Sequence, residues 1–137
     1  FLKGSDSGEI EMLRHIPGIR VAKVSETKKF FWNMNDLEKK QMGVLAKQVI
    51  TDTEMMLGRD EADVLILDEV MGALKNGILH MDELEHLLDR KPEHVEIVLT
   101  GRDAPQALID RAHLVTEMVA TKHYLDAGVK ARKGIEY

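Results

Sequence analysis

Two stretches decide the fold class: Val64-Leu65-Ile66-Leu67-Asp68-Glu69 and Val95-Glu96-Ile97-Val98-Leu99-Thr100-Gly101-Arg102. Each is a short apolar run followed at once by polar residues, a pattern typical of a strand in a parallel sheet. The run 64–67 contains no polar residue, which predicts a strand that is covered on both faces. Because ligands bind beyond the carboxyl ends of parallel strands, the polar residues after each run form the candidate site.

Outward from these two runs, segments with strand and helix patterns alternate. Strands are expected at 19–24, where apolar and polar residues alternate, and at 114–119; a further strand at 1–3 is left open. A long helix is expected from its cap at Asn35 to about Leu57, with Glu38 completing a capping box.

Two shorter helices complete the pattern. One is expected from a capping box formed by Asp82 and Glu85, and Pro92 stops it. The other begins near Pro105, in the first turn, where the missing N–H has no cost. The order β-α-β-α-β-α-β predicts an α/β domain with a mostly parallel sheet flanked by helices.

Length and composition exclude several classes of protein. The 137 residues suffice for a single domain, spanning 1–137. A net charge of −5 gives no electrostatic reason to bind nucleic acid or an anionic membrane, and no membrane-spanning run is present. The absence of cysteine excludes disulfides and thiolate nucleophiles and suits a reducing compartment, so we expect a cytoplasmic protein.

The residues after the first apolar run are carboxylates. An apolar strand that ends in Asp68-Glu69 has the Walker B arrangement, in which carboxylate oxygens hold Mg²⁺ against phosphate oxygens. In the alternative interpretation, Asp68 caps the following segment and Glu69 is solvated. From these two residues alone the two interpretations are about even.

The residues after the other strands are expected at the same edge. These are Thr100, Gly101 and Arg102, together with Glu117 on the last expected strand. Arg102 follows a glycine and is placed to bind a triphosphate with two donors. Taken singly, it is better explained as a surface arginine paired with Asp103 or Glu117.

The aromatic residues are concentrated in one place. Only 4% of the chain is aromatic, yet Phe30, Phe31 and Trp32 are contiguous. Three adjacent side chains cannot all face one core, so one of them is expected on a concave surface or a partner. The alternative packs Phe30 and Trp32 under the loop and leaves Phe31 exposed.

Taken together, these stretches resemble a known family. The resemblance covers 65–70, 73–79, 90–94 and 98–102, and is closest in the C-terminal runs Asp126-Ala127-Gly128-Val129-Lys130-Ala131 and Gly134-Ile135-Glu136-Tyr137. It extends to Phe1-Leu2-Lys3-Gly4 and the pair Phe30 and Trp32. Over essentially its whole length, the chain resembles the ATP:corrinoid adenosyltransferases of the cobalamin-synthesis and salvage type.

The resemblance implies a RecA-like P-loop NTPase fold and transfer of the 5′-deoxyadenosyl group of ATP to a reduced cob(I)alamin or other corrinoid, with release of triphosphate. It implies that Asp68 and Glu69 lie on the Mg²⁺ side. Thr100, Gly101, Arg102 and Glu117 are then expected to bind ATP, with Arg102 at the triphosphate.

The same resemblance gives the aromatic residues a role. Phe30 and Trp32 match the aromatics that crowd the lower face of the corrin and displace its axial base, which eases reduction of Co(II) to Co(I). It further implies an electron-donating reductase as a partner and a homodimer. Smaller departures from the family are Phe31 in place of threonine and Arg132 in place of glutamine.

One larger departure concerns the start of the chain. Family members carry a first strand, a glycine-rich phosphate loop and a first helix before the segment that matches Phe1-Leu2-Lys3-Gly4. We therefore expect the phosphate loop before Phe1 in a longer protein. The alternatives are a truncated paralogue that acts as a non-catalytic corrinoid-binding or structural module, and a generic P-loop ATPase or switch, in which the aromatic pair has no role.

Overall fold

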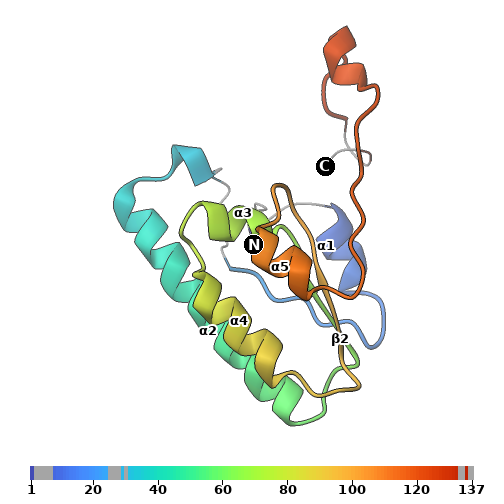
Figure 1. Ribbon diagram of the computed structural model, residues 1–137. Helices are drawn as coiled ribbons and strands as arrows, with labels where there is room; N and C mark the ends of the chain where they lie inside the picture. The colour runs from blue at the N-terminus through green and yellow to red at the C-terminus, as the bar shows by residue number, and fades with distance from the viewer. Residues whose placement is uncertain (2–7, 25–28, 30, 133–134, 136–137) are drawn as a thin grey trace.

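A computed structural model of the chain, drawn in Figure 1, describes residues 1, 8–24, 29, 31–132 and 135, without the side chain of Trp32. The elements are α1 (Gly8–Leu13), η1 (Phe31–Asn33), α2 (Asp36–Gly58), β1 (Val64–Leu67), α3 (Val70–Lys75), α4 (Met81–Arg90), β2 (Glu96–Leu99), α5 (Gln106–Arg111) and η2 (Tyr124–Ala127). The short α1 and α3 were not expected from the sequence.

The two deciding stretches form a parallel sheet. β1 pairs with β2 in a register that runs from Val64 opposite Glu96 to Leu67 opposite Leu99. One further backbone bond extends the ladder at its carboxyl end, because the Thr100 N–H donates to the Leu67 carbonyl at 3.2 Å. The predicted α/β class with parallel strands is confirmed for this pair.

The core lies between the sheet and the helices α2 and α4, which run side by side (Figure 1). The buried side chains of α2 recur at helical spacing, as an amphipathic helix requires. The largest side chains that are buried almost completely are Leu79, Leu84, Leu87, Val70 and Val95. This core fixes the two strands on which the candidate site is built.

The prediction that the run 64–67 is covered on both faces is wrong. Leu67 is buried and Leu65 packs against the core, but Val64 and Ile66 are 55% and 61% exposed. Successive side chains of a strand point to opposite faces. Within the described residues, the helices that bury β1 therefore cover one of its two faces.

The strands expected at 19–24 and 114–119 do not form. A strand needs a partner for its backbone groups, and the sheet of the described residues pairs β1 with β2 alone. All residues from 113 to 132 are exposed, and Figure 1 shows this segment leading away from the helices and strands toward η2. The open question at 1–3 falls partly on residues 2 and 3, outside the described residues.

The long helix is confirmed at both ends. Its cap is Asn35, whose side chain accepts from the Glu38 N–H at 2.9 Å, while the Glu38 carboxylate accepts from the Asn35 N–H at 2.9 Å. The helix ends at Gly58, one residue beyond the expected end. No helix in the part of the chain described is both long enough and apolar enough to cross a membrane.

The capping box of α4 lies two residues earlier than expected. His80 is the cap residue, with extended backbone, and its N–H donates to the Glu83 carboxylate at 3.0 Å. Asp82 and Glu85 already lie within the helix, so they cannot form the box. In α5, Pro105 occupies the cap position rather than the first turn.

Candidate functional site

The polar residues at the carboxyl ends of β1 and β2 form what we call the strand-end rim: Asp68, Glu69, Thr100, Gly101 and Arg102. The register sets Leu67 opposite Leu99, so the two polar segments leave the sheet side by side. The structure therefore brings these five residues to one edge of the sheet, as the sequence predicts.

Thr100 joins the two sides of the strand-end rim. Its hydroxyl donates to Asp68 Oδ1 at 2.8 Å and accepts from the Glu69 N–H at 2.9 Å. Because a hydroxyl has one proton, this double role fixes its orientation and aligns the Asp68 carboxylate. Asp68 therefore does not follow the alternative in which it caps α3, whose cap position is Glu69 without a side-chain cap bond.

Two backbone positions in the strand-end rim are left-handed. Glu69 has a φ of 57° at the start of α3. Gly101 has a φ of 140°, and a Cβ added there would lie 2.6 Å from the Cβ of Met71. Gly101 is thus required twice, by its conformation and by the close approach of α3 to the loop after β2. The Met71 N–H also donates to the Thr100 carbonyl at 3.4 Å.

Asp103 is paired with Lys75 and not with Arg102. The Lys75 Nζ lies 2.6 Å from Asp103 Oδ2, and this hydrogen bond lowers the pKa of the Asp103 carboxyl, with a smaller contribution from the charge of Arg102. Arg102 itself is exposed and forms no ion pair with any of the residues described. The guanidinium is therefore available for a ligand at the strand-end rim.

Two further contacts of this region have no signal in the sequence. Lys75 and Asp103 are 28 positions apart on unrelated patterns, so their pairing could not be anticipated. The backbone nitrogen of Phe1 donates to the Asp68 carbonyl at 2.9 Å, and Phe1 packs against the core. This contact places Phe1 beside the carboxyl end of β1.

A cavity of about 420 Å³ is lined by residues of α3 and by Asp103, the residue that follows the strand-end rim. It is lined by Met71, Leu74, Lys75, Leu79, His80, Met81, Asp103 and Pro105. Its walls are mostly apolar, and the Lys75–Asp103 ion pair lies among them.

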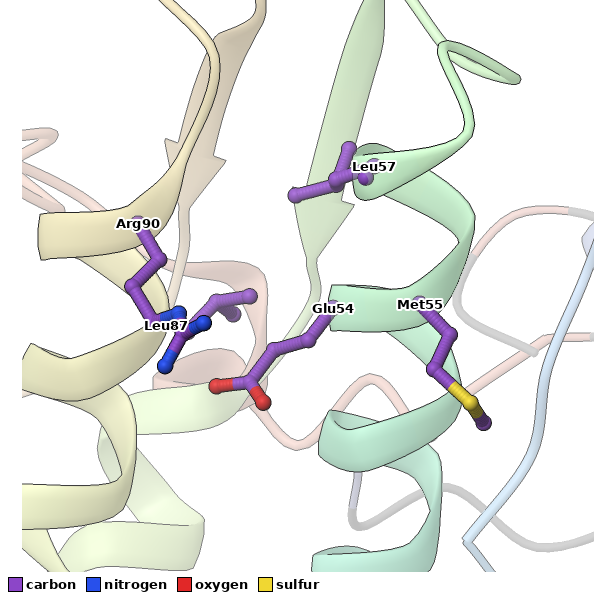
Figure 2. Close-up of a pocket in the computed structure, with 6 residues that line it drawn as sticks. Glu54, Met55, Leu57, Leu87 and Arg90 are labelled. Atoms are coloured by element: carbon purple, nitrogen blue, oxygen red, sulfur yellow. The ribbon is translucent and has the colours of Figure 1, made fainter.

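A second cavity, of about 370 Å³, lies between the C-terminal ends of α2 and α4. In Figure 2, Glu54 and Arg90 extend toward one another from the two helices, with Leu87 next to Arg90 and Leu57 above Glu54 in this view. His86 lies 3.8 Å from Glu54 and 3.5 Å from Arg90. This cavity is at the opposite end of the sheet from the strand-end rim, so we do not assign it to the same chemistry.

One predicted site residue that the structure describes, Glu117, is not brought to the strand-end rim. Glu117 belongs to the expected strand that does not form; it is exposed, and within the described residues no hydrogen bond or ion pair joins it to the strand-end rim. Phe30 lies outside the described residues, as does the side chain of Trp32. The backbone of Trp32 lies in η1, just before α2.

The strand-end rim offers hard oxygen ligands suited to Mg²⁺. Mg²⁺ commonly takes one or two protein carboxylates and completes its shell with water and phosphate. Asp68 and Glu69 supply that number, and the carboxylate of Asp68 is already oriented by Thr100. In the parts of the chain that the structure describes, no three acidic or histidine side chains cluster as a complete metal site.

The comparison with protein families decides the classification. The model of the family described as ATP:corrinoid adenosyltransferase BtuR/CobO/CobP matches residues 1–137. The chain belongs to this family. A corrinoid adenosyltransferase from Pseudomonas aeruginosa is 32% identical over 138 residues, which cover all of this chain and 66% of that protein.

Two more family members are similar at the same level. The corrinoid adenosyltransferase CobA of Salmonella typhimurium is 32% identical over 108 residues, covering 79% of this chain and 54% of that protein. A corrinoid adenosyltransferase from a Sinorhizobium species is 32% identical over 140 residues, covering all of this chain and 64% of that protein. The chain thus spans between about half and two thirds of these adenosyltransferases, and the resemblance noted in the sequence is confirmed.

Proposed function

We propose that the protein containing this chain transfers the 5′-deoxyadenosyl group of ATP to the cobalt of a cob(I)alamin or related corrinoid. In this reaction the Co(I) electron pair forms the Co–C5′ bond, the C5′–O bond breaks, and triphosphate leaves with the bonding electrons. The observation that carries the proposal is the strand-end rim, with its hydrogen-bonded Asp68 and Thr100, in a chain that belongs to this family.

The strand-end rim accounts for the charge of the leaving group. The triphosphate carries three negatively charged phosphate groups. Because this chain has a net charge of −5, the positive charge that neutralises them must be located at the binding site itself. We assign Arg102, Thr100 and Gly101 to the phosphates, and Glu117 to ATP through a position that the described contacts do not define. When bound by Asp68 and Glu69, Mg²⁺ would neutralise phosphate oxygens and stabilise triphosphate as a leaving group.

No protein nucleophile is needed, because the cobalt is itself the nucleophile. The chain therefore contributes orientation and charge neutralisation rather than covalent catalysis. We assign Phe30 and Trp32 to the lower face of the corrin, where they displace the axial base. The one-electron reduction of Co(II) to Co(I) then needs an electron from a reductase. We further propose that the full-length protein has a RecA-like P-loop fold. We also propose that it is a homodimer and that it acts in the cytoplasm.

The experiment uses the full-length protein with Mg-ATP and chemically reduced cob(I)alamin, and follows formation of adenosylcobalamin by absorbance. The double variant Asp68→Asn, Glu69→Gln removes both charges and keeps the shapes of the side chains. We expect kcat/KM to fall about 10²-fold, as for the loss of a group that stabilises charge in the transition state. A double variant as active as the wild type would contradict the site assignment.

The matched control is Glu54→Gln. Glu54 is also a carboxylate, with its side chain 25% exposed, but it lines the cavity at the opposite end of the sheet. We expect its activity to be unchanged. Titration calorimetry of Mg-ATP completes the test: a full-length protein that binds no Mg-ATP acts as a non-catalytic module.

A further inference from the structure

The residues on both sides of the aromatic cluster are bonded to one carboxylate. The Lys29 Nζ donates to Glu38 Oε1 at 2.5 Å, and the Asn35 N–H donates to Glu38 Oε2 at 2.9 Å. Lys29 precedes the cluster and Asn35 follows it. Glu38, in the first turn of α2, therefore closes a loop from position 29 to position 35.

The turn inside this loop is held at its centre as well. In η1, the Met34 N–H donates to the Phe31 carbonyl at 3.1 Å, and Met34 is buried. Phe31 packs against the core, with the Lys39 ammonium 5.2 Å from its ring centroid. Because η1 contains the backbone of Trp32, the position of η1 determines the position from which the Trp32 side chain extends.

The bond from Lys29 is not needed for the helix. The capping box of Asn35 and Glu38 already satisfies the two backbone donors at the start of α2. The Lys29 and Glu38 side chains are 53% and 30% exposed, and such pairs contribute little to global stability. The pair instead joins Lys29, which precedes the aromatic residues, to Glu38 in the first turn of α2.

Electrostatics keeps this contact ionised. The hydrogen bond from Lys29, followed by that from the Asn35 backbone, lowers the pKa of the Glu38 carboxyl. At neutral pH the carboxylate is charged and accepts both bonds. It is an acceptor at the two points where the loop begins and ends.

We propose that Glu38 is a positioning residue for the turn that carries Phe31 and the backbone of Trp32, which we call the aromatic turn, acting through Lys29 on one side and Asn35 on the other. Its effect on catalysis rests on the proposed function, in which Trp32 lies against the corrin. In this proposal Glu38 acts through the turn and not on a substrate, so it is a positioning residue rather than a catalytic one.

The chain has one tryptophan, so fluorescence reports on Trp32 directly. In the full-length protein, with the Trp32→Phe variant supplying the background signal, we expect the acrylamide quenching constant to rise about twofold in Lys29→Met and in Glu38→Gln, which corresponds to loss of a weak ion pair. Lys29→Arg keeps the pair and should restore the wild-type value. If quenching is the same in both variants and the wild type, Glu38 does not position the turn.

The control is Lys47→Met. Lys47 is an exposed residue of α2 that also pairs with a glutamate, Glu83, at 3.4 Å, but it lies further along the helix than the residues that hold the aromatic turn. We expect no change in quenching. Lys29→Met alone keeps the test decisive if Glu38→Gln fails to fold, because Lys29 is outside the helix.

A second measurement separates the two proposals. The absorbance of bound cob(II)alamin reports the fraction that has lost its axial base. We expect this fraction to fall in Glu38→Gln and Lys29→Met, with the Kd for Mg-ATP unchanged. If Trp32→Ala leaves that spectrum as in the wild type, the assignment of Trp32 to the corrin fails, while the quenching result still decides the role of Glu38.

Discussion

The strand-end rim and the C-terminal segment 113–132 both resemble the family in sequence, but they differ in structure. The strand-end rim is held by the Thr100 hydroxyl, by the sheet register and by the packing of Met71 against Gly101. Every residue of 113–132 is exposed, and the backbone hydrogen bonds described within it are local, such as Gly128 N–H to the Leu125 carbonyl at 2.8 Å.

The difference teaches that likeness to a family and support from the fold are separate properties. In the strand-end rim, a substitution changes the packing that positions the site, so stability and activity should fall together. In 113–132 every residue is exposed, so its side chains contribute little to the packing of the fold. A substitution there should affect activity without affecting stability.

The largest expected effect is that of Gly101→Ala. The new Cβ would meet the Met71 side chain at 2.6 Å, at a φ of 140°. We expect the free energy of unfolding to fall by about 2–4 kcal/mol, measured by urea denaturation. The matched change in the C-terminal segment is Gly128→Ala, at a φ of 80° with open space around it, and it should cost about 1 kcal/mol or less. Equal losses of unfolding free energy in the two variants would contradict the conclusion that the fold depends on the strand-end rim more than on 113–132.

Thr100→Val comes next. The valine has the same shape but leaves Asp68 Oδ1 without its donor and the Glu69 N–H without its acceptor. We expect a loss of about 1–2 kcal/mol, together with weaker Mg-ATP binding. Thr100→Ser keeps the hydroxyl and should retain most of both properties. Thr121→Val, in the exposed segment, provides the control and should unfold as the wild type does.

Glu117→Gln tests the other side of the comparison. Glu117 is exposed, so we expect the free energy of unfolding to change by less than about 0.5 kcal/mol. If Glu117 contributes to ATP binding as proposed, the KM for ATP should still rise. A variant that unfolds more easily than the wild type would mean that 113–132 contributes to the fold.

The smallest effect concerns the pH dependence of Asp103. The hydrogen bond from Lys75 lowers the pKa of this carboxyl below its ordinary value of 3.8. The ion pair therefore contributes stability above that value and loses it as the pH falls through the lowered pKa. In an NMR titration, Asp103 should titrate below 3.8 in the wild type and closer to 3.8 in Lys75→Met. Identical midpoints would show that Lys75 does not hold this carboxylate.

The sequence predicts best those elements whose signals are local. The capping box of Asn35 and Glu38, the apolar runs of β1 and β2 and the proline before α5 all act within a few residues, and each element is found in its expected place. The capping box of α4 was misplaced by two residues because the motif of Asp82 and Glu85 competes with that of His80 and Glu83. Both pairs have the required spacing.

Signals that depend on distant partners were less informative. The segments 19–24 and 114–119 have strand patterns, but a pattern cannot supply the neighbouring strand that would pair with them. The same limit applies to the site. Polar residues after two strands located the strand-end rim, whereas the Thr100 bridge and the pairing of Lys75 with Asp103 join residues about thirty positions apart and have no sequence pattern.

The left-handed backbone of Glu69 has a consequence for protein engineering. A glutamate with a φ of 57° is less stable there than glycine by roughly 1 kcal/mol. Glu69→Gly is therefore an attractive substitution for raising the melting temperature. It would also remove one of the two carboxylates assigned to Mg²⁺, so selection for thermal stability alone would move this chain away from the proposed chemistry.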